Sequence, residues 1–166
     1  MATILFFAEK DPYYEFSNFC PLKKPLAYRG KTFATSEHLY QWMKYPPDSD
    51  YAEQIRTINT AYKSKLLAGK TFLSRYPWQI ALHSTIRSAD VEQRSDWDRV
   101  SAMRIVLRVK YEQDKKFRKL LLGTGEAILC ENSPHDYFWG IGRKGTGKNM
   151  LGKLLMELRE EMCRSQ

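Results

Sequence analysis

The sequence predicts a single compact α+β domain over residues 1–166, mostly helical with a few short β-strands. Three observations support this fold class. A chain of 166 residues buries roughly 70% of its unfolded surface, so it can carry a core without disulfides or a structural metal. No repeat, low-complexity tract or Gly/Ser linker divides it. Segments with helical spacing of apolar residues outnumber the short β-branched and aromatic runs that are typical of strands.

The strands are expected at three places. Residues 3–7 form a run of β-branched and aromatic side chains, which predicts a buried strand. A second, short strand is expected at either 26–28 or 31–33, on one side of the turn at Arg29-Gly30. A last strand is expected at about 127–131.

The helices are expected at about 36–45, 50–57, 60–68, 96–112, 114–123 and from Asn149 onward. Thr35 or Ser36 offers a side-chain oxygen that caps the first of them, and Ser95 begins a capping box before the fourth. We expect Gly69 to close the third as a left-handed cap. Asn149 is expected to cap the final helix, whose apolar residues form one stripe.

The composition excludes several classes of protein. The 43% apolar and 13% aromatic content is too high for a disordered chain. No apolar run approaches the roughly 18 residues of a membrane-spanning helix, and the first residues lack the basic segment of a secretory signal. We therefore expect a cytoplasmic protein with no membrane partner.

The cysteines and histidines do not have the spacing of a disulfide framework or a zinc site. They are Cys20, Cys130, Cys163, His38, His83 and His135. We expect neither metal catalysis nor any other cofactor. The net charge of +8 favours contact with phosphate groups, on a nucleic acid or on a small nucleotide, and does not choose between them.

One face of the first predicted helix carries polar side chains. At 100° per residue, Glu37, Gln41 and Lys44 fall within an arc of about 60°, opposite Leu39 and Trp42. This stripe is either a solvent-exposed face or the wall of a cleft. In a cleft it would hold a carboxylate and an amine about 10 Å apart on one helix.

A glycine-rich segment precedes the final helix. Its four glycines lie with Arg143, Lys144 and Lys148 ahead of a helix N-terminus, a combination that suits a phosphate. A structural loop that needs positive φ values is the other interpretation. Residues 142–148 also match the opening of a Walker A motif, but Asn149 replaces its hydroxyl residue and too little chain follows for the sheet of an NTPase.

Several separate motifs in this chain resemble those of the NADAR family, the YbiA-like N-glycosidases. They occur in the expected order from about residue 5 to 160. The matching runs are Phe16-Ser17-Asn18-Phe19, Ser36-Glu37-His38-Leu39-Tyr40-Gln41 with Lys44, Leu121-Leu122-Gly123-Thr124-Gly125, Glu131 and Asp136, Trp139-Gly140-Ile141-Gly142, and Asn149-Met150-Leu151-Gly152. The segment 143–148 is more basic than a typical family loop.

The resemblance implies an enzyme that cleaves the N-glycosidic bond between a phosphorylated ribose and a nitrogenous base or amine, such as early intermediates of riboflavin synthesis. It places Glu37, Lys44 and Asp136 as catalytic residues. As residues that bind the substrate we expect Phe19, Gln41, Trp97, Trp139, Gly140, Gly142, Lys148 and Asn149. Trp139 would contact the base, and Asn149 with residues 140–148 would hold the 5′ phosphate.

These roles suit the chemistry. Breaking the bond develops positive charge at C1′ and requires a proton on the leaving nitrogen. Glu37 can meet either need, and Asp136 is a second acid or base candidate unless it is only a turn residue. The resemblance suggests a lysine that forms an imine with the opened ribose. Lys44 is the candidate, provided that burial or a nearby cation lowers its pKa.

Two other functions remain open at this point. One is an ADP-ribosyl-guanine hydrolase that acts on nucleic acid, which the positive charge favours. The other is a catalytically silent ADP-ribose-binding module. The expected partner is thus a small phosphoribosyl or ADP-ribosyl substrate, with nucleic acid as a possible carrier of the latter.

Overall fold

The computed structural model describes residues 2–70 and 77–165. Within this part of the chain it contains seven α-helices, one 3-10 helix and four short strands. The elements are β1 (Thr3–Phe6), η1 (Tyr14–Phe16), β2 (Leu26–Tyr28), β3 (Lys31–Phe33), α1 (Ser36–Trp42), α2 (Asp50–Thr57), α3 (Ala61–Ala68), α4 (Pro77–Arg87), α5 (Arg99–Gln113), α6 (Lys115–Gly123), β4 (Ile128–Glu131) and α7 (Met150–Arg164). This composition confirms the predicted mostly helical α+β class.

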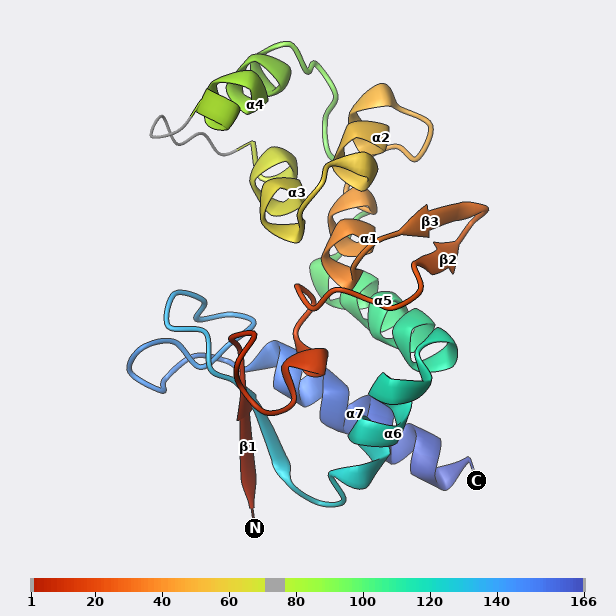
Figure 1. The fold of residues 1–166 in the computed structure, drawn as a ribbon, viewed down its shortest axis with the longest axis vertical. Helices are drawn as coiled ribbons and strands as arrows, with labels where there is room; N and C mark the ends of the chain where they lie inside the picture. The colour runs from red at the N-terminus through yellow and green to blue at the C-terminus, as the bar shows by residue number, and fades with distance from the viewer. Residues whose placement is uncertain (1, 71–76, 166) are drawn as a thin grey trace.

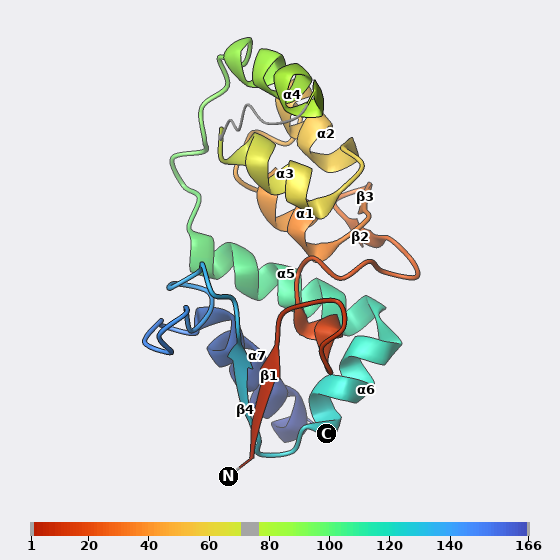
Figure 2. The same ribbon diagram turned by 60° about the vertical axis from the view of Figure 1, so that its left-hand side comes forward.

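The elements fall into an upper and a lower group (Figures 1 and 2). Helices α1 to α4 and the antiparallel β2–β3 hairpin form the upper group. The lower group contains α6, α7 and the parallel pair of β1 with β4, in which Thr3 is opposite Ile128 and Phe6 is opposite Glu131. Helix α5 runs between the two groups and packs against α1, α6 and α7.

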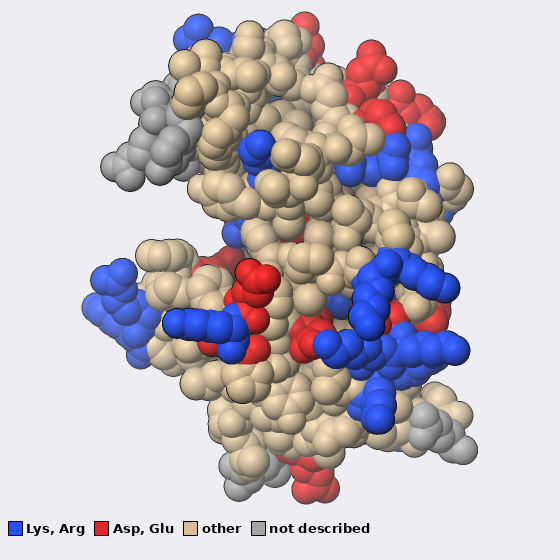
Figure 3. Space-filling model, in the orientation of Figure 1, with Lys and Arg blue, Asp and Glu red and all other residues tan. Residues whose placement is uncertain are grey.

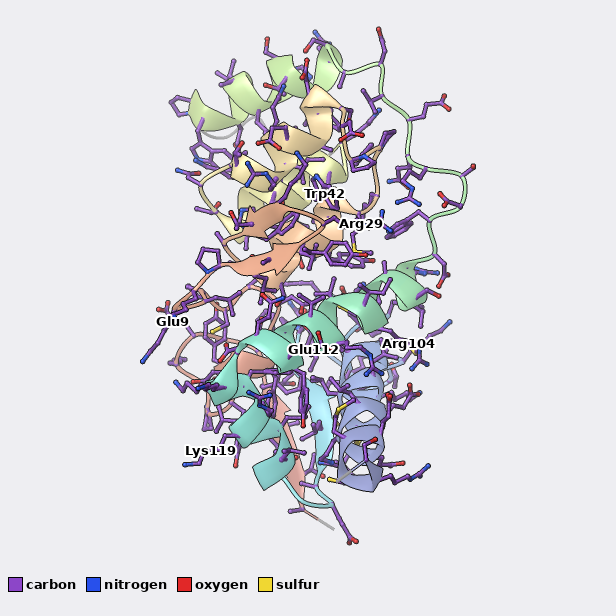
Figure 4. The ribbon with its side chains drawn as sticks, turned by 90° about the vertical axis from the view of Figure 1, so that its right-hand side faces the viewer. Glu9, Arg29, Trp42, Arg104, Glu112 and Lys119 are labelled. Atoms are coloured by element: carbon purple, nitrogen blue, oxygen red, sulfur yellow. The ribbon has the colours of Figure 1, made fainter. Side chains whose placement is uncertain are left out.

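Aromatic side chains fill the core on both sides of α5. In the lower group, Phe16 packs edge-on against Phe6 and Phe117, with ring centroids 5.5 and 5.9 Å away. In the upper group, Trp42, which is labelled in Figure 4, has edge-on ring contacts with Phe33 and Tyr28 of the hairpin. Burial of such rings supplies most of the driving force for folding.

Helices α5 and α7 lie side by side in Figure 4, where Arg104 is labelled on α5. Arg104 pairs with Glu157, and one turn further along Arg108 pairs with Glu161. Exposed ion pairs such as these contribute little to stability, so the apolar stripe of α7 holds the two helices together. That stripe includes Leu151, Leu154, Leu155 and Leu158, all of which are buried.

Several predicted boundaries need correction. Both candidate second strands exist, because they pair as a hairpin across Arg29-Gly30. Helix α5 begins at Arg99, since Asp98 rather than Ser95 accepts a hydrogen bond from the amide of Ser101. Gly69 has an ordinary helical φ of −81°, and Lys70 at +52° takes the left-handed position instead.

The structure adds a helix that the sequence analysis did not predict, α4. Among the residues that the structure describes, no helix is both long enough and apolar enough to cross a membrane.

Candidate active site

A cavity of about 700 Å³ opens between the upper and lower groups. Figure 3 shows this face hollowed on the left, between the α3–α4 region above and the loop that precedes α7 below. The cavity collects side chains from distant parts of the sequence. Its lining is Asn18, Phe19, Glu37, Tyr40, Gln41, Lys44, Lys65, Leu66, Gly69, Trp97, Asp98, Arg99, Met103, Glu131, Asp136, Trp139 and Leu151.

The predicted polar stripe of α1 faces this cavity. Thr35 caps the helix by accepting a hydrogen bond from the amide of His38. The amide of Glu37 donates to the carbonyl of Asn18 at 3.0 Å, which ties the start of α1 to the segment that carries Phe19. Helix α1 ends at Trp42, so Lys44 lies in the turn that follows. The cleft interpretation of the stripe is therefore confirmed, and the solvent-exposed interpretation is wrong.

Glu37 is a buried carboxyl group with one close partner. Its residue exposure is 5%, and its Oε1 accepts a hydrogen bond of 2.6 Å from Gln41 Nε2. Burial raises the pKa of Glu37, while the Gln41 hydrogen bond and the nearby Lys65 and Lys44 act in the opposite direction. The carboxyl group is thus placed where positive charge on a bound sugar would be stabilised.

Lys44 has the environment that the imine hypothesis requires. Its Nζ lies 5.4 Å from the ring centre of Trp97 and 5.5 Å from that of Tyr40. Burial lowers the pKa of Lys44, Lys65 lowers it further and Glu37 opposes both. A lower pKa leaves a larger fraction of free amine, which is the nucleophilic form.

Asp136 lines the cavity and also holds a turn. Its Oδ1 accepts hydrogen bonds from the amides of Phe138 at 2.9 Å and Trp139 at 2.7 Å. Asp136 therefore both holds the turn and lines the cavity. The turn aims Trp139 into the cavity, where it packs edge-on against Tyr40 at 5.7 Å.

The other wall of the cavity is also aromatic. Trp97 also packs edge-on against Tyr40, with ring centres 5.8 Å apart, and the Nζ of Lys65 lies over the ring of Phe19, 5.6 Å from its centre. Of the predicted binding residues, Phe19, Gln41, Trp97 and Trp139 thus meet in one place.

The remaining predicted binding residues, Gly140, Gly142, Lys148 and Asn149, do not line the cavity. The backbone amides at the end of this loop are not free to bind a phosphate, because the amides of residues 147–151 donate to the carbonyls of residues 137–141. Gly140 is required for close packing, since a Cβ there would meet the carbonyl oxygen of Glu131 at 2.7 Å. The Nζ of Lys148 lies over the ring of Phe138.

Asn149 does not cap α7 as expected. Its side chain makes no cap hydrogen bond, and its φ of +53° is left-handed. Instead its Nδ2 donates to the carbonyl of Leu129 at 2.8 Å, and its Oδ1 accepts from the amide of Glu131 at 3.0 Å. The residue therefore fastens the start of α7 to β4.

Ten of the residues that line the cavity had no predicted role, and four of them, Asn18, Lys65, Arg99 and Glu131, bring polar or charged groups to it. Asn18 and Glu131 stand in the motifs that resemble the NADAR family, and this is the signal that could have identified them. Lys65 and Arg99 lie on helices that no motif marks, and only the folded arrangement brings them to the cavity.

Four buried polar atoms of the cavity lining have no hydrogen-bond partner within the part of the chain that the structure describes. They are Asn18 Oδ1, Gln41 Oε1, Trp97 Nε1 and Glu131 Oε2. Buried polar atoms are usually paired, so their presence together indicates a polar ligand. Among the described residues, no cluster of three or more His, Cys, Asp or Glu side chains could hold a metal ion.

Comparison with known proteins points to one family. Residues 5–163 match the family described as NADAR domain. The chain is 38% identical over 162 residues to N-glycosidase YbiA of Escherichia coli, covering 96% of this chain and 88% of that protein. It is 35% identical to N-glycosidase Npun_R5314 of Nostoc punctiforme, with 96% and 92% of the two chains covered.

A plant relative and a solved structure agree with this similarity. The chain is 30% identical to the riboflavin biosynthesis protein PYRR of Zea mays, covering 96% of this chain and 25% of that protein. The NMR structure of the Escherichia coli protein YbiA superimposes with a TM-score of 0.72 at 35% identity, covering 99% of this chain and 86% of that one. These similarities confirm the expected N-glycosidase class, and the chain belongs to the NADAR domain family.

Proposed function

We propose that this N-glycosidase hydrolyses the bond between C1′ of a phosphorylated ribose and the nitrogen of a base or amine, with early intermediates of riboflavin synthesis as its substrate class. One observation carries the proposal: the Glu37 carboxyl group and the Lys44 amine face one cavity that is walled by aromatic rings. The substrate class follows from the similarity to PYRR.

The reaction begins when the bond between C1′ and the leaving nitrogen breaks, as that nitrogen takes up a proton. Glu37 stabilises the positive charge that develops at C1′. The Lys44 amine adds to C1′, and ring opening moves a proton from Nζ to the ring oxygen and forms the imine. Water then adds to C1′ and releases ribose phosphate and the free amine, so the balance is hydrolysis of one bond by one water.

The unpartnered acceptors suit the sugar. Ribose hydroxyl groups are donors, and Asn18 Oδ1 and Gln41 Oε1 are acceptors that lack a donor within the described residues. A bound ribose would satisfy both atoms, and an analogue without hydroxyl groups would leave them unpaired at a cost of about 1–3 kcal/mol each. This arrangement favours a sugar over a flat aromatic ligand alone.

Lys65 and Arg99 are the residues that we assign to the phosphate. Both are exposed and line the cavity, and Arg99 is held by stacking of its guanidinium on Phe138 at 3.8 Å. They replace the glycine-rich loop in this role, because the amides at the end of that loop are already bonded. A guanidinium and an ammonium group are the usual partners of a phosphate.

The second candidate substrate is an ADP-ribosylated base in nucleic acid. The net charge of +8 favours it, since a basic surface attracts a phosphate backbone. Turnover of such a substrate would fall steeply as the salt concentration rises, whereas turnover of a small phosphoribosyl compound would change little. Mass spectrometry of the products from both substrates, incubated in parallel at two salt concentrations, separates the candidates.

Lys44→Ala tests the mechanism. Borohydride reduction during turnover should trap a covalent adduct on the wild-type chain and none on Lys44→Ala, and kcat should fall by about 10³-fold or more. Lys153→Ala, a change of an exposed lysine on α7, is the matched control and should retain both adduct and rate. An adduct of equal yield on Lys44→Ala would contradict the assigned nucleophile.

A further inference from the structure

Glu131 has the only carboxyl oxygen of the described residues that is both buried and without a partner. It ends β4 and lines the cavity opposite α1. An unpaired buried carboxyl oxygen costs free energy, so it calls for an explanation. Nothing in the proposed steps above uses it.

The backbone amide and carbonyl of Glu131 are both hydrogen-bonded. Its amide donates to Asn149 Oδ1, and its carbonyl accepts from the amide of Ile141 at 2.9 Å. Its Cα is paired with Phe6 in the parallel β1–β4 ladder. The side chain thus starts from a rigid position, while Oε2 is left for a ligand.

The surroundings of Glu131 favour the protonated carboxylic acid. Burial, together with the neighbouring Asp136 and Glu37, raises its pKa to about 8 against the opposing effect of Lys65. Burial raises the pKa of Glu37 as well, but there the Gln41 hydrogen bond and two nearby lysines oppose the rise, whereas at Glu131 only Lys65 does. The two buried carboxyl groups therefore suit different tasks in one cavity.

Asp136 is less suited to donate the proton. Its Oδ1 is engaged by the amides of Phe138 and Trp139 and keeps the turn that aims Trp139. We propose that Glu131 is the general acid that protonates the leaving nitrogen, and that Asn149 is the positioning residue that holds Glu131 for this transfer. This inference rests on the proposed function.

The proton balance is simple. As the bond between C1′ and nitrogen breaks, the proton of Glu131 moves to that nitrogen and leaves a carboxylate. The water that hydrolyses the imine later returns a proton to Glu131, so the enzyme regains its starting state. No other reactant is needed.

The test compares two substrates that differ in this one requirement. The nitrogen of an aminopyrimidine ribosyl 5′-phosphate must be protonated to leave, whereas a ribosyl pyridinium 5′-phosphate loses a neutral pyridine and needs no proton. Glu131→Gln keeps the shape of the side chain and removes the acid. We expect kcat/KM to fall by about 10²–10⁴-fold on the first substrate and by less than about threefold on the second.

Glu126→Gln, a change of an exposed residue two positions before β4 begins, is the matched control and should equal wild type on both substrates. Equal losses of Glu131→Gln on the two substrates, or no loss on either, would overturn the assignment to Glu131 alone. Cleavage of neither substrate by the wild-type chain would instead overturn the proposed function together with it.

A second measurement needs no variant and so does not depend on folding of Glu131→Gln. For the wild-type chain, kcat/KM on the aminopyrimidine substrate should decline above pH 8, and the pyridinium substrate should lack this decline. Asn149→Gly should change the pH at which kcat/KM on the aminopyrimidine substrate declines. If Asn149 had a purely structural role, the change would lower kcat/KM on both substrates in parallel at every pH. Superimposable pH profiles of the two substrates would refute the proton transfer.

Discussion

Removal of the Asn149 side chain should destabilise the fold by an amount that its contacts define. The change Asn149→Gly deletes the two hydrogen bonds to Leu129 and Glu131. Each leaves a backbone group of β4 unpaired at a cost of about 1 kcal/mol, so the free energy of unfolding should fall by about 2 kcal/mol. Glycine accepts the left-handed backbone of this position without strain.

Asn149→Ala removes the same hydrogen bonds and adds a second penalty. Alanine at a φ of +53° costs about 1 kcal/mol relative to glycine. The expected loss is therefore about 3 kcal/mol, a large part of the roughly 5–15 kcal/mol that stabilises a typical domain.

Urea denaturation followed by tryptophan fluorescence measures both changes, and an unchanged m-value would show that the unfolding reaction is the same. Asn132→Ala, at an exposed position next to β4, is the control and should stay within about 0.5 kcal/mol of wild type. The reasoning fails if Asn149→Ala is as stable as Asn149→Gly, or if both match wild type.

Three further predictions concern buried charges. Because the pKa of Glu131 is raised to about 8 from about 4.3 in the unfolded chain, wild type should lose stability relative to Glu131→Gln as the pH rises from 4.5 to 8; equal slopes in urea titrations would contradict this. Burial lowers the pKa of Lys110 to about 8, so wild type should gain stability relative to Lys110→Met between pH 8 and 10, measured in the same way. Arg159→Met removes hydrogen bonds to Thr124 at 2.7 Å and Ala127 at 3.0 Å and should cost about 2–3 kcal/mol, seen as a lower Tm.

Local signals in the sequence predicted most of the elements. Thr35 caps α1, and Asp114 caps the helix expected at 114–123. Residues 3–6 form strand β1, but only Phe6 of these four residues is buried, so the expectation of a buried strand is wrong. Helix α4 was missed although Trp78, Leu82 and Ile86 recur every four residues, which is the spacing of an apolar helix stripe. Leu82 belongs to the core, and Trp78 and Ile86 pack against it.

The site was predictable where one helix carries it. Glu37, Gln41 and Lys44 are separated by helical spacing, so their common face follows from the period alone. The loop before α7 was not predictable in this way. Whether its amides are free depends on pairing with residues six to twelve positions earlier in the chain, and this pairing follows from no periodicity in the sequence.

The burial of Glu131 could not be predicted from the sequence either. Its sequence context places it at the end of a strand, but its burial depends on α1, α3 and the turn at Asp136 closing over it. Desolvation is a property of the folded arrangement, and a charged residue in a sequence is most often exposed.

The parallel pairing of β1 with β4 has a consequence for synthesis on the ribosome. Residues 3–6 emerge more than a hundred positions before residues 128–131, which are their only strand partner in the described part of the chain. The hairpin and the upper helices can assemble while β1 waits with an open edge, and contacts of such long range form slowly. A nascent chain that stops short of β4 therefore carries Glu37 and Lys44 but lacks Glu131, Asp136 and Trp139, which line the same cavity.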